Sequence, residues 1–339
     1  MTIKIAMLAP ISWRTPPRHY GPWEWIVSLL TEGLVNKGCD VTLYATGDSV
    51  TAAHHRWTVA RPYSEDSEVD AKVAECLHIS AVFEEAQRYD IIHNNFDFMP
   101  LSYSTLVQTP VLTTIHGFSS AKIVPVYCKY NRNTYYISIS NADRHPELDY
   151  EATIYHGIPV NEYPFSAGKG DYLLFLGRIH HDKGAKEAIA LARQTRIPLV
   201  IAGIVQDESY YQQFVAPHVD GNSIIFMGTV NDETKKKLLA GANALLHLIN
   251  FNEPFGLTVI EAMACGTPVI AMRRGSMPEI IKAGETGFLI NDLEDGKRSI
   301  EKLNALSRNR CREWVEERFS VDTMVNNYEK IYQNILDRR

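Results

Sequence analysis

Short apolar segments alternate along the chain with longer segments in which apolar residues recur every three or four positions. The first kind is typical of strands buried in a parallel sheet, and the second is typical of amphipathic helices. The predicted strands are residues 3–8, 41–45, 91–93, 111–115, 135–139, 152–155, 173–176, 199–202, 224–227, 244–248 and 269–271. The predicted helices are residues 23–36, 69–89, 99–107, 183–195, 232–240, 254–264, 278–283 and 308–336, the last with a break near 319–320. This alternation predicts an α/β protein with doubly wound parallel sheets.

The segment 159–170 interrupts the alternation with Pro, Gly and polar residues between two apolar strands. Such composition is typical of a domain boundary, and a chain of 339 residues is long enough for two domains. We therefore predict a first Rossmann-like domain at 1–165 and a second at 166–321. A final helix at about 322–339 is expected to pack back on the first domain, and the two domains are expected to face each other across a cleft.

Composition narrows the class of protein. The chain is 45% apolar and 22% charged, as in soluble globular proteins, and its net charge of −6 argues against a nucleic-acid partner. The five cysteines are far apart in the sequence, which predicts reduced, buried thiols in a cytoplasmic protein. The sequence starts with an apolar strand rather than a signal peptide, and no apolar run approaches the roughly 18 residues of a membrane span. Peripheral membrane association remains open.

The segment 252–266 carries the strongest candidate chemistry. A helix that starts near Pro254 would point the free amides of Phe255, Gly256 and Leu257 at an anion, and Gly256 has no side chain to block the approach. Thr258 and Glu261 are three residues apart and share a helix face. A hydroxyl beside a phosphate and a carboxylate beside ribose hydroxyls would suit a nucleoside diphosphate. Glu253 precedes the helix and would face the group attached to the far phosphate.

A second candidate segment is 177–184. Arg178 follows a predicted strand and Lys183 begins a predicted helix, so these two cations can neutralise a diphosphate. Glycine follows three strands, at Gly177, Gly203 and Gly228. Because ligands of parallel sheets bind at the carboxyl ends of strands, these glycines either let a ligand approach or simply form tight turns.

These motifs resemble those of the family 4 retaining glycosyltransferases, which have the two-domain GT-B fold. Glu253 and Glu261 match the family's Glu-x7-Glu motif, and Arg178 with Lys183 matches its phosphate motif. The segments 114–117 (Thr-Ile-His-Gly) and 155–159 (Tyr-His-Gly-Ile-Pro) resemble its N-domain histidine motif and its linker entry. The likeness extends over essentially the whole chain, and it is greatest to a bacterial subgroup whose N-terminal loop reads Tyr-Gly-Gly-x-Glu.

The resemblance implies a role for each motif. Arg178 and Lys183 would bind the diphosphate, Glu261 the ribose and Glu253 a hydroxyl of the donor sugar, while His116 would contact the sugar from the other domain. The resemblance further implies retention of the anomeric configuration, with the leaving diphosphate accepting the acceptor's proton. The implied catalytic residues are His116, Glu253, Arg178 and Lys183. The implied donor-binding residues are Gly21, Gly177, Gly203, Thr229, Val230, Phe255, Gly256, Leu257, Thr258 and Glu261.

The N-terminal loop departs from the subgroup. Pro22 replaces its second glycine, which removes one backbone donor and stiffens the loop. Because this loop is aromatic and basic, part of it is expected to form acceptor surface, whereas Trp25 is expected to be core. The predicted acceptor-side residues are Tyr20, Trp23, Glu24 and Asp97.

No cofactor and no metal are expected. The sequence has no dinucleotide fingerprint, P-loop or zinc-protease motif. Three adjacent residues such as His180, His181 and Asp182 rarely converge on one ion. We therefore predict a metal-independent transfer of a hexose from a nucleotide-sugar, UDP-sugar before GDP-sugar, to a small-molecule, glycan or lipid-linked acceptor. The alternatives are a sugar-nucleotide epimerase or phosphorylase on the same fold, and a non-catalytic sugar-nucleotide-binding protein.

Overall fold

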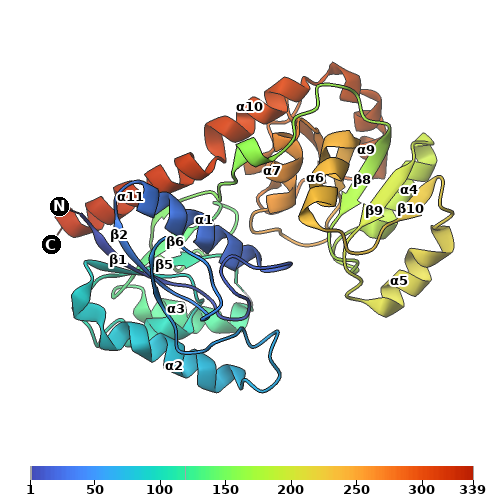
Figure 1. The fold of residues 1–339 in the computed structure, drawn as a ribbon. Helices are drawn as coiled ribbons and strands as arrows, with labels where there is room; N and C mark the ends of the chain where they lie inside the picture. Colours follow the sequence, from blue (N-terminus) through green and yellow to red (C-terminus); the bar gives the residue numbers. More distant parts are fainter. Residues whose placement is uncertain (1, 119, 339) are drawn as a thin grey trace. The chain divides into compact units, whose positions relative to one another are not determined.

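The computed structural model describes residues 2–118 and 120–338. The chain divides into two compact units, which we call unit 1 (residues 1–157 with 321–339) and unit 2 (residues 158–320). The first division falls between residues 157 and 158, eight residues before the boundary at residue 165 that the sequence predicts. Each unit contains one parallel sheet with helices beside it (Figure 1).

Unit 1 is built on a seven-stranded parallel sheet in the order β3-β2-β1-β4-β5-β6-β7. The strands are β1 (Lys4–Leu8), β2 (Asp40–Tyr44), β3 (His54–Arg56), β4 (Ile91–Asn94), β5 (Val111–Ile115), β6 (Tyr135–Ser138) and β7 (Tyr150–Thr153). The helices are α1 (Pro22–Asn36), α2 (Ala71–Glu84), α3 (Val124–Tyr130) and α11 (Val321–Asp337). The inner strands are buried on both faces, which explains why they contain many apolar residues.

Unit 2 is built on a six-stranded parallel sheet in the order β10-β9-β8-β11-β12-β13. The strands are β8 (Tyr172–Leu176), β9 (Leu199–Ala202), β10 (Ile224–Phe226), β11 (Ala242–His247), β12 (Val269–Met272) and β13 (Gly287–Ile290). The helices are α4 (Ala185–Thr195), α5 (Glu208–Phe214), α6 (Asp232–Gly241), α7 (Leu257–Ala264), α8 (Met277–Ile280), α9 (Leu293–Glu301) and α10 (Arg308–Arg318). The α/β class and the doubly wound sheets predicted from the sequence are confirmed.

Some predicted elements are wrong. The helix expected at 99–107 is a short 3-10 turn, Met99–Tyr103, which ends where the Ser104 hydroxyl bonds back to the Leu101 carbonyl. A hydroxyl that competes for backbone groups in this way favours a turn over continued helix. The sequence prediction also missed β3, α3, α5, β13 and α9. Of these, β3 is a polar edge strand of three residues, too short to show a period of two.

The C-terminal helix α11 lies in unit 1. Gly33 of α1 leaves room for Val325, since a Cβ at Gly33 would lie 2.4 Å from a methyl group of that valine. The hydroxyls of Tyr328 and Tyr332 hydrogen-bond to Thr114 and His93 at 2.8 and 2.7 Å. These buried polar contacts fix α11 against β4 and β5.

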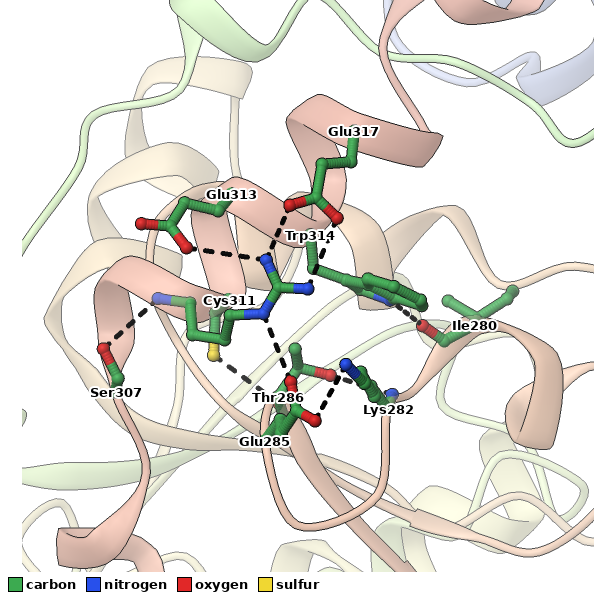
Figure 2. Close-up of polar contacts among 10 residues, drawn as sticks. Ile280, Lys282, Glu285, Thr286, Ser307, Cys311, Glu313, Trp314 and Glu317 are labelled. Atoms are coloured by element: carbon green, nitrogen blue, oxygen red, sulfur yellow. Dashed lines mark hydrogen bonds and ion pairs between the residues drawn. The ribbon is translucent and has the colours of Figure 1, made fainter.

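In unit 2, α10 is held by side chains along its length. Figure 2 shows Trp314 donating to the Ile280 carbonyl (2.8 Å) and Cys311 facing the Thr286 carbonyl (3.6 Å). Arg310 binds Glu285 and Glu317. Further along α10, Arg312 donates to the carbonyl of Ala264 at 2.8 Å. Because Ala264 is the last residue of α7, this guanidinium caps that helix and fixes its position in the unit.

The cysteines and the helices test two further expectations. All five cysteines are free thiols, but only Cys265 and Cys311 are buried, and Cys76 is exposed. The expectation that all five are buried is therefore wrong. Over the described residues, every helix is too short or too polar to cross a membrane.

Candidate functional site

Two loops meet at the carboxyl edge of the unit 2 sheet. The sheet grows from β8 to β9 and β10 on one side and to β11, β12 and β13 on the other, so the order reverses between β8 and β11. Open parallel sheets bind ligands at such a reversal. The loop 177–184 follows β8, and the loop 248–256 follows β11. The two are in contact, since the Asn250 amide donates to the Asp182 carbonyl (2.7 Å) and a Cβ at Gly184 would lie 1.9 Å from the Leu248 carbonyl oxygen.

Lys183 and Glu253 form an ion pair across these two loops. Nζ of Lys183 lies 2.9 Å from Oε2 of Glu253, and each side chain is only 16% exposed. The ammonium also lies 4.5 Å from the centre of the Phe251 ring. Nε2 of His247 is 3.7 Å from the same carboxylate oxygen, and burial lowers the pKa of His247 to about 4, which leaves it neutral. The structure therefore brings together two residues that the sequence analysis selected separately.

Arg178 lies on the other side of the same loop. Its guanidinium donates to Oε1 of Gln206 and lies 3.9 Å from Oδ2 of Asp182. Gly177 precedes it with no side chain and almost no neighbour within 4 Å of a Cβ position, so this glycine leaves open space. Gly203 differs, because a Cβ there would lie 1.8 Å from the Gly177 carbonyl oxygen. Close contact between β8 and β9 therefore explains Gly203 without a ligand.

Helix α7 begins three residues later than expected. Gly256 is its N-cap at φ 95°, Leu257 is its first residue, and Pro254 therefore lies in the preceding loop rather than in the first turn. Phe255 also precedes the helix, and its carbonyl accepts a hydrogen bond from the Ser276 hydroxyl at 2.7 Å. The positive φ at residue 256 explains the shift, since it ends the loop in a conformation that a helix does not adopt. The outward amides are therefore those near Gly256, Leu257 and Thr258.

Glu261 is held by two residues that the sequence analysis missed. Its Oε1 accepts from the Tyr163 hydroxyl and from Nζ of Lys235, both at 2.9 Å, and Glu261 is only 6% exposed. Burial acts to lower the pKa of Lys235, but the carboxylates of Glu261 and Asp232 outweigh it and raise that pKa. Lys235 therefore stays charged, and its hydrogen bond orients the carboxylate of Glu261.

The remaining predicted donor-binding residues are two that follow the edge strand β10 and one in helix α7. Thr229 and Val230 lie just after β10, where Thr229 is exposed and Val230 is half-buried. Thr258 is half-buried in the first turn of α7. All three lie at or near the carboxyl edge of the same sheet.

Unit 1 has a reversal of its own, between β1 and β4. His116 follows β5, and its Nε2 lies 3.0 Å from Oδ1 of Asn95, which follows β4. The other ring nitrogen lies 3.4 Å from His156, and Trp23 of α1 stacks on the His116 ring at a centroid distance of 5.4 Å. Burial lowers the pKa of His116 to about 3, so the imidazole is neutral and acts as a hydrogen-bonding group rather than a cation.

The loop before α1 folds onto the start of that helix. Gly21 is the N-cap at φ 147°, and Pro22 occupies the first helical position, where a proline costs no hydrogen bond. Glu24 is 3% exposed and accepts from the Trp13 amide at 3.2 Å, and its burial raises its pKa to about 7. This contact makes Glu24 part of the loop's own structure, while Tyr20 is 53% exposed.

Asp97 has a conformation that is unusual for its type. It follows β4 with φ 83°, and its carboxylate accepts a hydrogen bond from the buried Tyr127 hydroxyl. A positive φ outside glycine costs free energy, and such residues cluster at functional sites. Asp97 remains a predicted acceptor-side residue.

Trp25, which the sequence analysis assigned to the core, is half-buried.

Comparison with known proteins identifies relatives of this chain. Residues 162–319 match the family model described as glycosyl transferases group 1. An uncharacterised glycosyltransferase of Methanocaldococcus jannaschii is 26% identical over 336 residues, which cover 85% of each chain. The N-acetyl-alpha-D-glucosaminyl L-malate synthase of Bacillus anthracis is 37% identical over 127 residues, which cover 35% of this chain and 32% of that enzyme.

A solved structure extends the likeness to the fold. The crystal structure of Anabaena Alr3699/HepE in complex with UDP and glucose superposes with a TM-score of 0.74 at 20% identity, covering 98% of this chain and all of that one (100%). At this identity the likeness concerns the fold alone. It confirms the GT-B fold expected from the sequence.

Proposed function

We propose that the chain, a glycosyltransferase similar to family 4 enzymes, transfers a hexose with retention from a UDP-sugar. GDP-sugar is the second choice of donor. The acceptor is a small molecule, a glycan or a lipid-linked sugar. We further propose that the reaction needs no metal and takes place in the cytoplasm, with peripheral membrane association left open.

One observation carries the proposal: the Lys183–Glu253 ion pair lies where the strand order of unit 2 reverses, with Arg178 on the same loop. A diphosphate at this position would have two cations to neutralise it. The outward amides of Gly256 and Leu257 add donors that cost no reorganisation when the anion arrives. This set of groups supplies the charge that a divalent metal supplies in other transferases.

The ion pair also defines a sequence of contacts. When the diphosphate binds, it competes with Glu253 for Lys183. The carboxylate of Glu253 is then released to accept a hydrogen bond from a hydroxyl of the donor sugar. Its neighbour His247 is neutral and so does not take over as a counter-charge.

The nucleoside end of the donor is assigned to Glu261. A ribose presents two adjacent hydroxyl donors, and a carboxylate fixed by Tyr163 and Lys235 is prepared to accept them. Thr258 is assigned to the phosphate, and Gly203, Thr229 and Val230 to the base through their backbone groups. The UDP-bound Anabaena structure, which shares the fold, supports UDP as the nucleotide to test first.

The catalytic step is proposed to depend on charge stabilisation and positioning. Arg178 and Lys183 stabilise the negative charge that develops on the leaving diphosphate. The bond between the anomeric carbon and that diphosphate breaks as the acceptor oxygen bonds to the same face, and the acceptor's proton passes to the diphosphate. His116 is assigned to the donor sugar as a neutral hydrogen-bonding group.

The proposal is tested first by donor binding and then by product stereochemistry. A thermal-shift screen with UDP, GDP and ADP should show the largest stabilisation with UDP. NMR of the product should show the anomeric configuration of the donor, and an inverted product would refute the retaining assignment. Binding of UDP with neither transfer to an acceptor panel nor slow donor hydrolysis would identify a non-catalytic binder instead.

A further inference from the structure

Two loops of unit 2 bring three potential metal-binding residues together beside the predicted diphosphate residues. His180 and His181 lie in the loop after β8, and Asp207 lies in the loop after β9. One ligand atom from each of these residues lies within 4.8 Å of the other two. The sequence argued against a metal at His180, His181 and Asp182, but the structure replaces the third residue with one that is distant in the sequence.

The two loops are joined by backbone hydrogen bonds. The Ile179 amide donates to the Ile204 carbonyl at 2.8 Å, and the Ile179 carbonyl accepts from the amides of Gln206 and Asp207 at 3.2 and 3.1 Å. The positions of the three candidate ligands are therefore fixed relative to one another by the backbone. Binding to such a cluster orders only side chains, which keeps the entropic cost low.

His180 and Asp207 are each oriented by a second contact. Nδ1 of His180 lies 2.6 Å from Oδ1 of Asp182, so Nε2 is the ring nitrogen that is left as a ligand. A carboxylate beside the other ring nitrogen is common among metal-binding histidines. Oδ1 of Asp207 accepts from the Tyr210 amide at 2.9 Å, while Oδ2 faces Nδ1 of His181 at 3.8 Å.

We propose that His180, His181 and Asp207 form a binding site for a divalent transition metal, with Zn²⁺ as the best match. Two imidazoles and one carboxylate are a known zinc ligand set, with water in the fourth position. Ligands at about 2.0–2.2 Å from zinc lie roughly 3.4 Å apart, so the ligand atoms must approach one another by up to about 1.4 Å. The ring of His181 lies 4.1 Å from the ring of His180, but its side chain is 68% exposed, so little else opposes this movement.

The metal site is separate from the transfer chemistry, yet it is linked to the loop that carries it. Asp182 lies 3.9 Å from Arg178, and Gln206, next to Asp207, accepts from the same guanidinium. Metal binding would therefore fix both partners of Arg178. Any effect of Zn²⁺ on UDP affinity must then equal the effect of UDP on Zn²⁺ affinity. The proposal does not depend on the transferase assignment, since it concerns metal binding alone.

The test is calorimetric titration of Zn²⁺ into the full-length, tag-free protein after treatment with EDTA. We expect one equivalent to bind. His181→Ala should lower the affinity at least tenfold, as should Asp207→Asn, which keeps the amide oxygen needed to cap α5. Circular dichroism checks that both variants are folded.

The matched control is His54→Ala. His54 is exposed, stands next to His55, and lies 3.5 Å from Asp40, but its neighbour projects from the opposite face of β3. This change should leave the stoichiometric site unaltered. The proposal is overturned if no stoichiometric Zn²⁺ binds, if His181→Ala binds as the wild type does, or if His54→Ala lowers the affinity as much as His181→Ala.

Discussion

Replacement of Lys183 tests the central assignment most directly. A charge-assisted hydrogen bond to a phosphate contributes about 1.5–3 kcal/mol, which corresponds to a loss of about 10- to 150-fold in UDP affinity for Lys183→Ala. The structure places the expected loss in the upper half of this range. The variant retains the carboxylate of Glu253, 16% exposed and without its cation, at the position where the diphosphate must bind.

A double-variant cycle separates these two contributions. Glu253→Gln alone removes the competitor for Lys183, so UDP binding should become stronger. Lys183→Ala with Glu253→Gln should regain about 1 kcal/mol relative to Lys183→Ala, because the carboxylate no longer repels the ligand. Calorimetry with UDP measures all four proteins without any requirement for turnover.

The control for this cycle is Lys237→Ala. Lys237 is 72% exposed and pairs with Glu233 along the same helix, so its removal should change UDP affinity less than twofold. The assignment is refuted if Lys183→Ala binds UDP within twofold of the wild type. The competition argument alone fails if the double variant binds no better than Lys183→Ala.

Three further predictions concern other parts of the chain. Glu24→Gln should remove a pH dependence of stability. Between pH 4.5 and 7 the free energy of unfolding should fall by about 3 kcal/mol, because Glu24 ionises in the unfolded chain over this range while its raised pKa keeps it protonated in the folded protein; urea unfolding of both proteins across this range measures the difference. Tyr163→Phe should lower the free energy of unfolding by about 1 kcal/mol and weaken UDP binding, because Glu261 loses one of its two partners; equal UDP affinity by calorimetry would argue against the ribose assignment. Addition of EDTA should not abolish sugar transfer, and an absolute requirement for Mg²⁺ or Mn²⁺ would contradict the metal-free reaction.

The sequence was sufficient for the fold because buried parallel strands leave a direct signal. Strand β9, for example, is apolar and fully buried, and its predicted bounds are the observed ones. The short elements were missed for the opposite reason: β3 is too short and too polar to show a period, and α3 begins next to a proline that reads as a loop.

The site was predictable only where its residues belong to local motifs. Lys183 and Glu253 were each selected from their own segment, but their contact at 2.9 Å depends on the strand order of unit 2. Lys235 and Tyr163 gave no signal, because a lysine in an exposed helix and a tyrosine in a linker are ordinary in a sequence. Their function arises only through Glu261, which is 26 and 98 residues away.

The Lys183–Glu253 contact links the two tasks of the proposed site. An isolated ammonium in a partly buried position is costly to desolvate, and Glu253 offsets that cost in the free protein. A binding diphosphate supplies the same compensation with more charge, so the lysine can change partners with little loss. The carboxylate that it leaves then carries an unpaired charge beside a neutral histidine, and a sugar hydroxyl is the donor best placed to satisfy it. Binding of the phosphate thus prepares the group that orients the sugar. For this reason, Glu253→Gln should bind UDP more tightly than the wild type and yet transfer sugar more slowly.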